Sequence, residues 1–153
     1  MIQYRLLPVI LTAILCAVPS LAQPPLRVQG GNLVMSITDG VVDGDLIPII
    51  NTAANLRWRR LPELTKITVS TTCPGQRFTL QVFAVNPSEG VAAPEVTLTT
   101  GAPAVDLVTN MPAGGPKNND CVLRYTASAT FSQGNSAELG NDVHTVRYTI
   151  VAQ

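Results

Sequence analysis

Residues able to perform covalent chemistry are few in this chain, which contains one histidine and three cysteines. A hydrolytic triad would use His144 as the base between a serine nucleophile and an aspartate. The nucleophile-elbow sequence G-x-S-x-G, which would support such a triad, does not occur. His144 begins an alternating segment beside Asp142, a position typical of a strand end. The sequence therefore predicts no catalytic residues and a protein that is not an enzyme.

Three aspartates could hold a metal ion in the acidic, glycine-rich stretch 39–45. Asp39, Asp43 and Asp45 offer the carboxylate oxygens that Ca²⁺ prefers, although their spacing does not match an EF-hand loop. Acidic residues among glycines are also ordinary turn chemistry. A calcium site at these three residues is thus one hypothesis and a plain turn is the other. No other cofactor is predicted.

The cysteines predict a disulfide. Cys16 lies in the N-terminal apolar run, which leaves Cys73 and Cys121 as a pair. In an oxidising compartment such a pair most simply forms one bridge. Metal binding by two isolated thiolates would lack the further ligands that a metal site needs.

The first 22 residues are typical of a cleavable secretory signal. Arg5 precedes the apolar run Leu6–Val18, and Ser20 and Ala22 place small residues at positions −3 and −1 of a cut before Gln23. The run is short for a membrane span, although an uncleaved anchor is the alternative. We expect a secreted, periplasmic or cell-surface protein with no membrane span after cleavage.

Cleavage after Ala22 is an expected result that can be measured directly. The exported protein should begin at Gln23, which can cyclise to pyroglutamate, and it should lack Cys16. Intact-mass measurement of the exported chain tests both points. A mature species that still carries Cys16 would contradict the signal-peptide interpretation.

The charge balance argues against nucleic acid as a partner. Ten Lys and Arg residues offset ten Asp and Glu residues. The only basic cluster is Arg57-Trp58-Arg59-Arg60, in which alternation turns Trp58 inward and Arg57 and Arg59 outward. Binding to nucleic acid would need a broader basic surface. The expected partner is protein, and self-association by strand pairing is one hypothesis for it.

The elements that would position these residues are strands, because apolar residues recur with a period of two. Both cysteines lie in the apolar phase of their segments, so both are expected to point into one core. Phe83 is an exception, since it faces away from the apolar side of its segment. The predicted strands are 33–37, 55–60, 66–73, 78–84, 95–99, 121–131 and 144–152.

Short strands separated by turn signals predict an all-β fold. We expect residues 23–153 to form one antiparallel, immunoglobulin-like (Greek-key) β-sandwich with one internal disulfide, after the signal peptide 1–22. The Gly30-Gly31 pair could act as a hinge that lets Leu26–Ile37 fold onto its own sheet or pair with a neighbouring subunit. We expect the segment to fold onto its own sheet, with Leu33–Ile37 as a strand of the same domain.

The chain resembles bacterial surface-fibre subunits of the pilin type, which have immunoglobulin-like domains. The likeness lies in the signal peptide, the alternating N-terminal segment, the one expected disulfide, the threonine-rich strands and the C-terminal strand Val146–Ile150. It departs from the pilin pattern because Cys73 is not in the first strand. The resemblance implies a structural or interaction protein of the cell surface or extracellular matrix. The alternative is a small soluble extracellular binding module with a loop ligand or a Ca²⁺ site.

Overall fold

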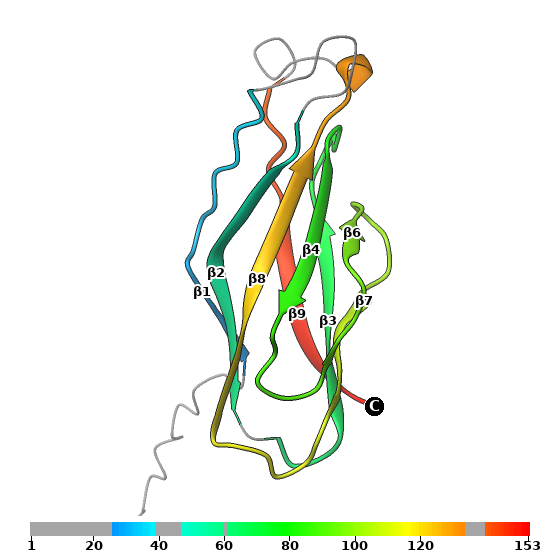
Figure 1. Cartoon of the computed structure of the whole chain (residues 1–153). Helices are drawn as coiled ribbons and strands as arrows, with labels where there is room; N and C mark the ends of the chain where they lie inside the picture. The colour runs from blue at the N-terminus through cyan, green and yellow to red at the C-terminus, as the bar shows by residue number, and fades with distance from the viewer. Residues whose placement is uncertain (1–25, 39–46, 60, 134–139) are drawn as a thin grey trace, which may run out of the picture.

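The structure, a computed structural model, describes residues 26–38, 47–59, 61–133 and 140–153. In this part of the chain, nine strands form two antiparallel sheets that make an elongated sandwich (Figure 1). The helical turn η1, Phe131–Gln133, is a short 3-10 helix. No helix within the described ranges is long and apolar enough to cross a membrane. The prediction of an antiparallel β-sandwich is confirmed.

The larger sheet has five strands in the order β1-β2-β8-β4-β6. Its centre is the long antiparallel pair of β2 and β8, which lie side by side in Figure 1. Both strands alternate between buried and outward side chains over most of their length, as a strand with one face on the core must. The strands are β1 (Leu26–Gln29), β2 (Ile49–Arg59), β8 (Asn118–Ser128), β4 (Thr79–Val85) and β6 (Val96–Leu98).

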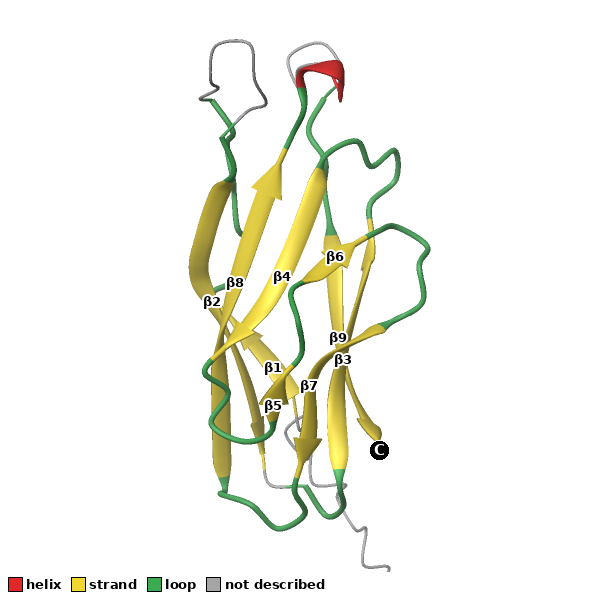
Figure 2. Cartoon of the chain, turned by 45° about the vertical axis from the view of Figure 1, so that its right-hand side comes forward, coloured by secondary structure: helices red, strands yellow, loops and turns green. Residues whose placement is uncertain are grey.

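The smaller sheet has four strands in the order β5-β7-β3-β9, and it faces the larger sheet across the core (Figure 2). Strand β3 is paired on both sides, with β7 and with β9. Among the described strands, β9 lies at the edge of this sheet. The strands are β5 (Val91–Ala92), β7 (Val105–Met111), β3 (Thr65–Thr72) and β9 (Thr145–Ala152).

The strand order departs from the immunoglobulin-like order that we expected. From β2 onward, each successive strand lies in the opposite sheet, so every connection crosses the sandwich. In an immunoglobulin domain the last two strands share a sheet, whereas β8 and β9 lie in different sheets. The described residues therefore form an antiparallel β-sandwich without the immunoglobulin strand order.

The core lies between the two sheets and consists of the inward phases of their strands. Trp58 is 2% exposed, which confirms that alternation turns it inward. Arg57 and Arg59 on either side of it are exposed, as predicted. The largest completely buried side chains are Leu56, Ile67, Val69, Cys73, Val82, Leu107, Val108, Met111 and Leu123.

Residues 33–37 do not form the predicted strand. Strand β1 pairs with β2 only as far as Gln29, beside the irregularity that interrupts β2 between Asn51 and Ala54. Gly30 follows with φ +98°, and a Cβ on it would lie 2.4 Å from the Ala53 carbonyl oxygen. Only glycine tolerates both this dihedral angle and this close approach, so the chain leaves the ladder here. Leu33 and Met35 still pack against the core, but without a ladder.

Candidate functional site

The predicted calcium ligands Asp39, Asp43 and Asp45 lie within residues 39–46, outside the described residues. The signal segment Met1–Ala22 is also outside them. The calcium site and the signal cleavage therefore stay predictions.

The structure does not contain the predicted disulfide, because Cys73 and Cys121 are both buried free thiols. They lie near opposite ends of β4. Cys73 is close to Asp142, whose carboxylate accepts a hydrogen bond from the amide of Phe78, just before β4. Cys121 is adjacent in sequence to Val122, which pairs with Val85 at the other end of β4. Seven extended residues span roughly 20 Å. A disulfide needs Cα atoms within about 7 Å of each other.

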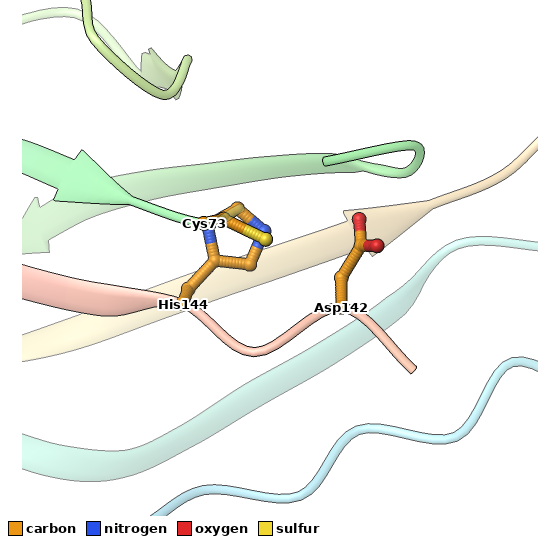
Figure 3. A group of neighbouring side chains, drawn as sticks. All are labelled: Cys73, Asp142 and His144. Carbon is orange, nitrogen blue, oxygen red and sulfur yellow. The ribbon is translucent and has the colours of Figure 1, made fainter. Parts of the chain in front are cut away.

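A different set of side chains comes together at the Cys73 end of the sandwich. Cys73 directly follows β3, His144 directly precedes β9, and Asp142 lies two residues before His144 (Figure 3). One ligand atom from each, a sulfur, a carboxylate oxygen and a ring nitrogen, lies within 4.8 Å of the others. Cys73 is buried, while Asp142 and His144 are half-buried. We call these three residues the Cys73 cluster.

Asp142 is held in place by backbone amides. Its Oδ2 atom accepts hydrogen bonds from the N–H groups of Arg77 and Phe78, at 2.9 and 2.8 Å. These amides belong to the turn that leads from β3 into β4, so the carboxylate fastens the segment before β9 to that turn. Both bonds use the same oxygen atom, Oδ2. The other carboxylate oxygen, Oδ1, is therefore not used by these two amides.

His144 is oriented by β3. Its Nδ1 lies 3.1 Å from the hydroxyl oxygen of Thr71, and that hydroxyl also lies 3.5 Å from the Thr145 carbonyl oxygen. A carbonyl oxygen only accepts. In the tautomer with the proton on Nδ1, the hydroxyl donates to Thr145 and accepts from Nδ1–H, and Nε2 of His144 carries the lone pair. Burial lowers the pKa of His144, and the negative charge of Asp142 opposes that shift.

The Cys73 cluster is not arranged as a catalytic triad. Burial and the nearby charge of Asp142 raise the pKa of the Cys73 thiol, against a smaller effect of a backbone hydrogen bond from Val143. A nucleophilic cysteine needs the reverse, a lowered pKa and access for substrate. In addition, Nδ1 of His144 is bound to Thr71 and not to a carboxylate, so no acidic group orients the ring as a base.

Sequence reasoning placed His144 at a strand end beside Asp142, and that placement is confirmed. It missed that Cys73 joins them. The available signal was the spacing Asp-x-His, because residues two apart on an extended chain point to the same side. Nothing in the sequence pattern says that β9 pairs with β3 so that Thr72 lies opposite Thr145. That register is what carries Cys73 to the other two residues.

The free edge of β9 is a second feature with functional meaning. The amide of Gln153 donates to the carbonyl of Leu64, so Gln153 and Leu64 are a hydrogen-bonded pair. Hydrogen-bonded and non-hydrogen-bonded pairs alternate along an antiparallel ladder, so this one bond tells which residues of β9 bond to β3. The N–H and C=O groups of every second residue then point away from β3, into the open edge. These residues are Val146, Tyr148, Ile150 and Ala152. Among the described residues, no strand pairs with this edge.

The outward face of the larger sheet carries both polar and apolar side chains. Phe83, which breaks the apolar phase of its strand, lies on that face with the Arg124 guanidinium 4.9 Å from its ring centre. Glu95 in turn accepts hydrogen bonds from Arg124 and Thr126. Phe83 is therefore covered by a cation–π contact from a neighbouring strand. This leaves the Cys73 cluster and the β9 edge as the two candidate functional features.

Both features are identified from the sequence and the structure of this chain alone. No protein-family model, no curated protein and no solved structure matches it.

Proposed function

We propose that this chain is a secreted, non-enzymatic structural or interaction protein of the cell surface or extracellular matrix. In this proposal it associates with further copies of itself by pairing strands at the β9 edge. The observation that carries the proposal is the row of outward-pointing backbone groups along β9, which no strand covers in the described part of the chain. Such an edge is a template for another strand, and proteins that do not use one usually block it.

The β9 edge carries few of the devices that block strand pairing. Arg147 is its one charged side chain, and the strand contains no proline and no bulge in its ladder with β3. Val146, Tyr148 and Ile150 point inward yet stay half-buried, and within the described ranges no further strand covers that side. An added strand would bury more of these three side chains as well as satisfy the open backbone groups.

We take the partner of the β9 edge to be a second copy of this chain, because the chain contains a segment suited to pair with that edge. Leu33, Met35 and Ile37 alternate with the exposed residues Val34 and Ser36, yet this segment forms no strand. It follows the Gly30-Gly31 pair, whose positive φ angles release it from β2. An alternating segment without a ladder in one copy and an edge without a strand in another are complementary.

Two further observations support the rest of the proposal. The signal-like N-terminus favours export, which the intact-mass measurement above tests. The Cys73 cluster, the one grouping of Cys, His and acidic residues found in the described ranges, lacks the hydrogen bond that would orient His144 as a catalytic base. A structural or interaction role fits both features.

Blocking the edge of β9 should abolish self-association without unfolding the domain. The N–H of Ile150 faces the open edge, so Ile150→Pro removes a donor there and places the proline ring where a partner strand would lie. The matched control is Ile150→Ala, which loses the same side chain but keeps the N–H group. We expect wild-type protein and Ile150→Ala to sediment as dimers or polymers at high concentration, and Ile150→Pro to sediment as a monomer.

Circular dichroism and thermal unfolding of the two variants separate a blocked edge from a lost fold. A folded Ile150→Pro protein that associates as strongly as Ile150→Ala would show that β9 is not the contact. A wild-type chain that stays strictly monomeric at high concentration would overturn the assembly proposal. It would favour the second candidate, a small extracellular binding module that holds a ligand in loops at one end of the sandwich. The observation that favours this candidate is the Cys73 cluster, which lies between strand ends (Figure 3).

A further inference from the structure

We infer that Cys73, Asp142 and His144 form a binding site for Zn²⁺. The three side chains come from two segments far apart in the sequence, the end of β3 and the residues that lead into β9 (Figure 3). Their ligand atoms already lie within 4.8 Å of one another. This inference goes beyond the proposed assembly, because it uses other atoms and does not depend on the β9 edge.

The donor set matches the chemistry of zinc. Thiolate sulfur, imidazole nitrogen and carboxylate oxygen are the three protein ligands that Zn²⁺ commonly takes, in a tetrahedral arrangement. The ligand atoms of such a site are about 3.5 Å apart, so the three groups must approach each other by roughly an ångström. Three protein ligands leave the fourth position for water, on the half-exposed side of Asp142 and His144.

Hydrogen bonds around the cluster already hold two of the ligands in suitable orientations. The Thr71 hydroxyl is hydrogen-bonded to Nδ1 of His144, so Nε2 is the ring nitrogen left for a metal. The amides of Arg77 and Phe78 occupy Oδ2 of Asp142, which leaves Oδ1 as the ligand atom. Metal-binding histidines and carboxylates usually carry such outer hydrogen bonds.

The charges also balance. When Zn²⁺ binds, the Cys73 thiol releases its proton to solvent, and the resulting thiolate together with the Asp142 carboxylate supplies two negative charges. Two negative charges neutralise one divalent cation, so the filled site is neutral. A neutral complex avoids most of the cost of burying a charge beside the completely buried Cys73. The sulfur and nitrogen donors disfavour Ca²⁺, which takes six to eight oxygen ligands.

The test uses the reduced chain, Zn²⁺, and Co²⁺ as a spectroscopic substitute for Zn²⁺. We expect one Zn²⁺ per chain with a dissociation constant of about 1 μM or below in competition with a chromophoric chelator. Bound Co²⁺ should give the visible bands of a tetrahedral ion and a near-ultraviolet thiolate-to-metal band. Excess Ca²⁺ should not displace either ion.

Three variants remove one ligand each, and one variant is the matched control. Cys73→Ser, Asp142→Asn and His144→Gln should each weaken Zn²⁺ binding by about 100-fold or more. Asp142→Asn retains an oxygen that accepts from the Arg77 and Phe78 amides and replaces the ligand oxygen by an NH2 group, so it tests the ligand atom apart from the hydrogen bonds. Cys121→Ser removes the other buried thiol and should bind Zn²⁺ like the wild type.

Several results would overturn the inference. These are a wild-type chain that binds no Zn²⁺ at millimolar concentration, a Cys73→Ser variant that keeps the thiolate-to-metal band, and a loss of binding in Cys121→Ser. A Cys73–Cys121 disulfide in protein purified without reductant would overturn it too, because the ligand sulfur would then be bonded. Failure here leaves the sedimentation result for Ile150→Pro unaffected, so the two proposals fail separately.

Discussion

Replacing Trp58 by alanine is expected to lower the free energy of unfolding by about 3–5 kcal/mol. The indole is 2% exposed and lies on β2 between two neighbouring strands, opposite Leu26 on β1 and Asn119 on β8. Removal of so large a buried side chain loses its transfer free energy and leaves a cavity between the two sheets. Denaturant unfolding of the wild type and the variant, followed by circular dichroism, measures the difference.

A matched variant separates burial of the ring from its hydrogen bonding. The indole Nε1 has no hydrogen-bond partner among the described residues. Trp58→Phe keeps much of the apolar contact and removes this unpartnered donor, so it should cost clearly less than Trp58→Ala. Trp58 is the single tryptophan of the chain, so its emission should be blue-shifted in the folded state. Water-like, fully quenchable emission, or a negligible cost for Trp58→Ala, would place Trp58 on a contact surface.

Alternation predicted which way side chains point, and it did so well where ladders are regular. Trp58 and Leu123 point into the core as their phase requires. Alternation predicted no strand over β7, where Leu107 and Val108 are both buried although they are neighbours in the sequence. The ladder of β3 with β7 contains register shifts at this place. A bulge changes the phase of a strand, and period-two reasoning cannot anticipate it.

The two cysteines show the limit of this reasoning for the candidate site. The alternation of apolar and polar residues correctly predicted that both thiols point into the core. This alternation does not predict how far along the sandwich each cysteine lies. Position depends on strand order and register, which bring Cys73 to Asp142 and His144 and leave Cys121 far along the core. For the same reason, the Cys73 cluster could not be found from spacing, since Cys73 and Asp142 are 69 positions apart in the sequence.

The second large effect is expected at alkaline pH, from groups buried between the sheets. Tyr125 on β8 and Tyr148 on β9 face each other across the core, and their hydroxyl groups are hydrogen-bonded. Burial raises the pKa of both phenols. Burial, together with the charge of Asp120, also raises the pKa of the Cys121 thiol from 9.0 to about 12. All three groups therefore keep their protons in the folded chain at a pH where the unfolded chain loses them.

The sign of the pH dependence follows from these shifts. The unfolded chain releases these protons near pH 9.0 for the cysteine and near pH 10.0 for the tyrosines, while the folded chain retains them. The stabilisation is complete below pH 9 and is lost as the pH rises through the folded-state pKa values. Between its unfolded-state and folded-state pKa values, each group lowers the free energy of unfolding by up to about 1.4 kcal/mol per pH unit. We expect unfolding in alkali to coincide with the appearance of tyrosinate absorbance.

Removing the tyrosine hydroxyls tests this explanation. In the chain that begins at Gln23, Tyr125 and Tyr148 are the only tyrosines. Either single change to phenylalanine leaves one buried hydroxyl without its partner and should cost about 1–3 kcal/mol at neutral pH. The double variant removes both hydroxyls, so it should cost less than the two single changes together, and its stability should fall less steeply above pH 10. Tyrosinate that forms with an ordinary midpoint while circular dichroism still reports a folded chain would mean that water reaches these hydroxyls, and the two sheets would not be closed over them.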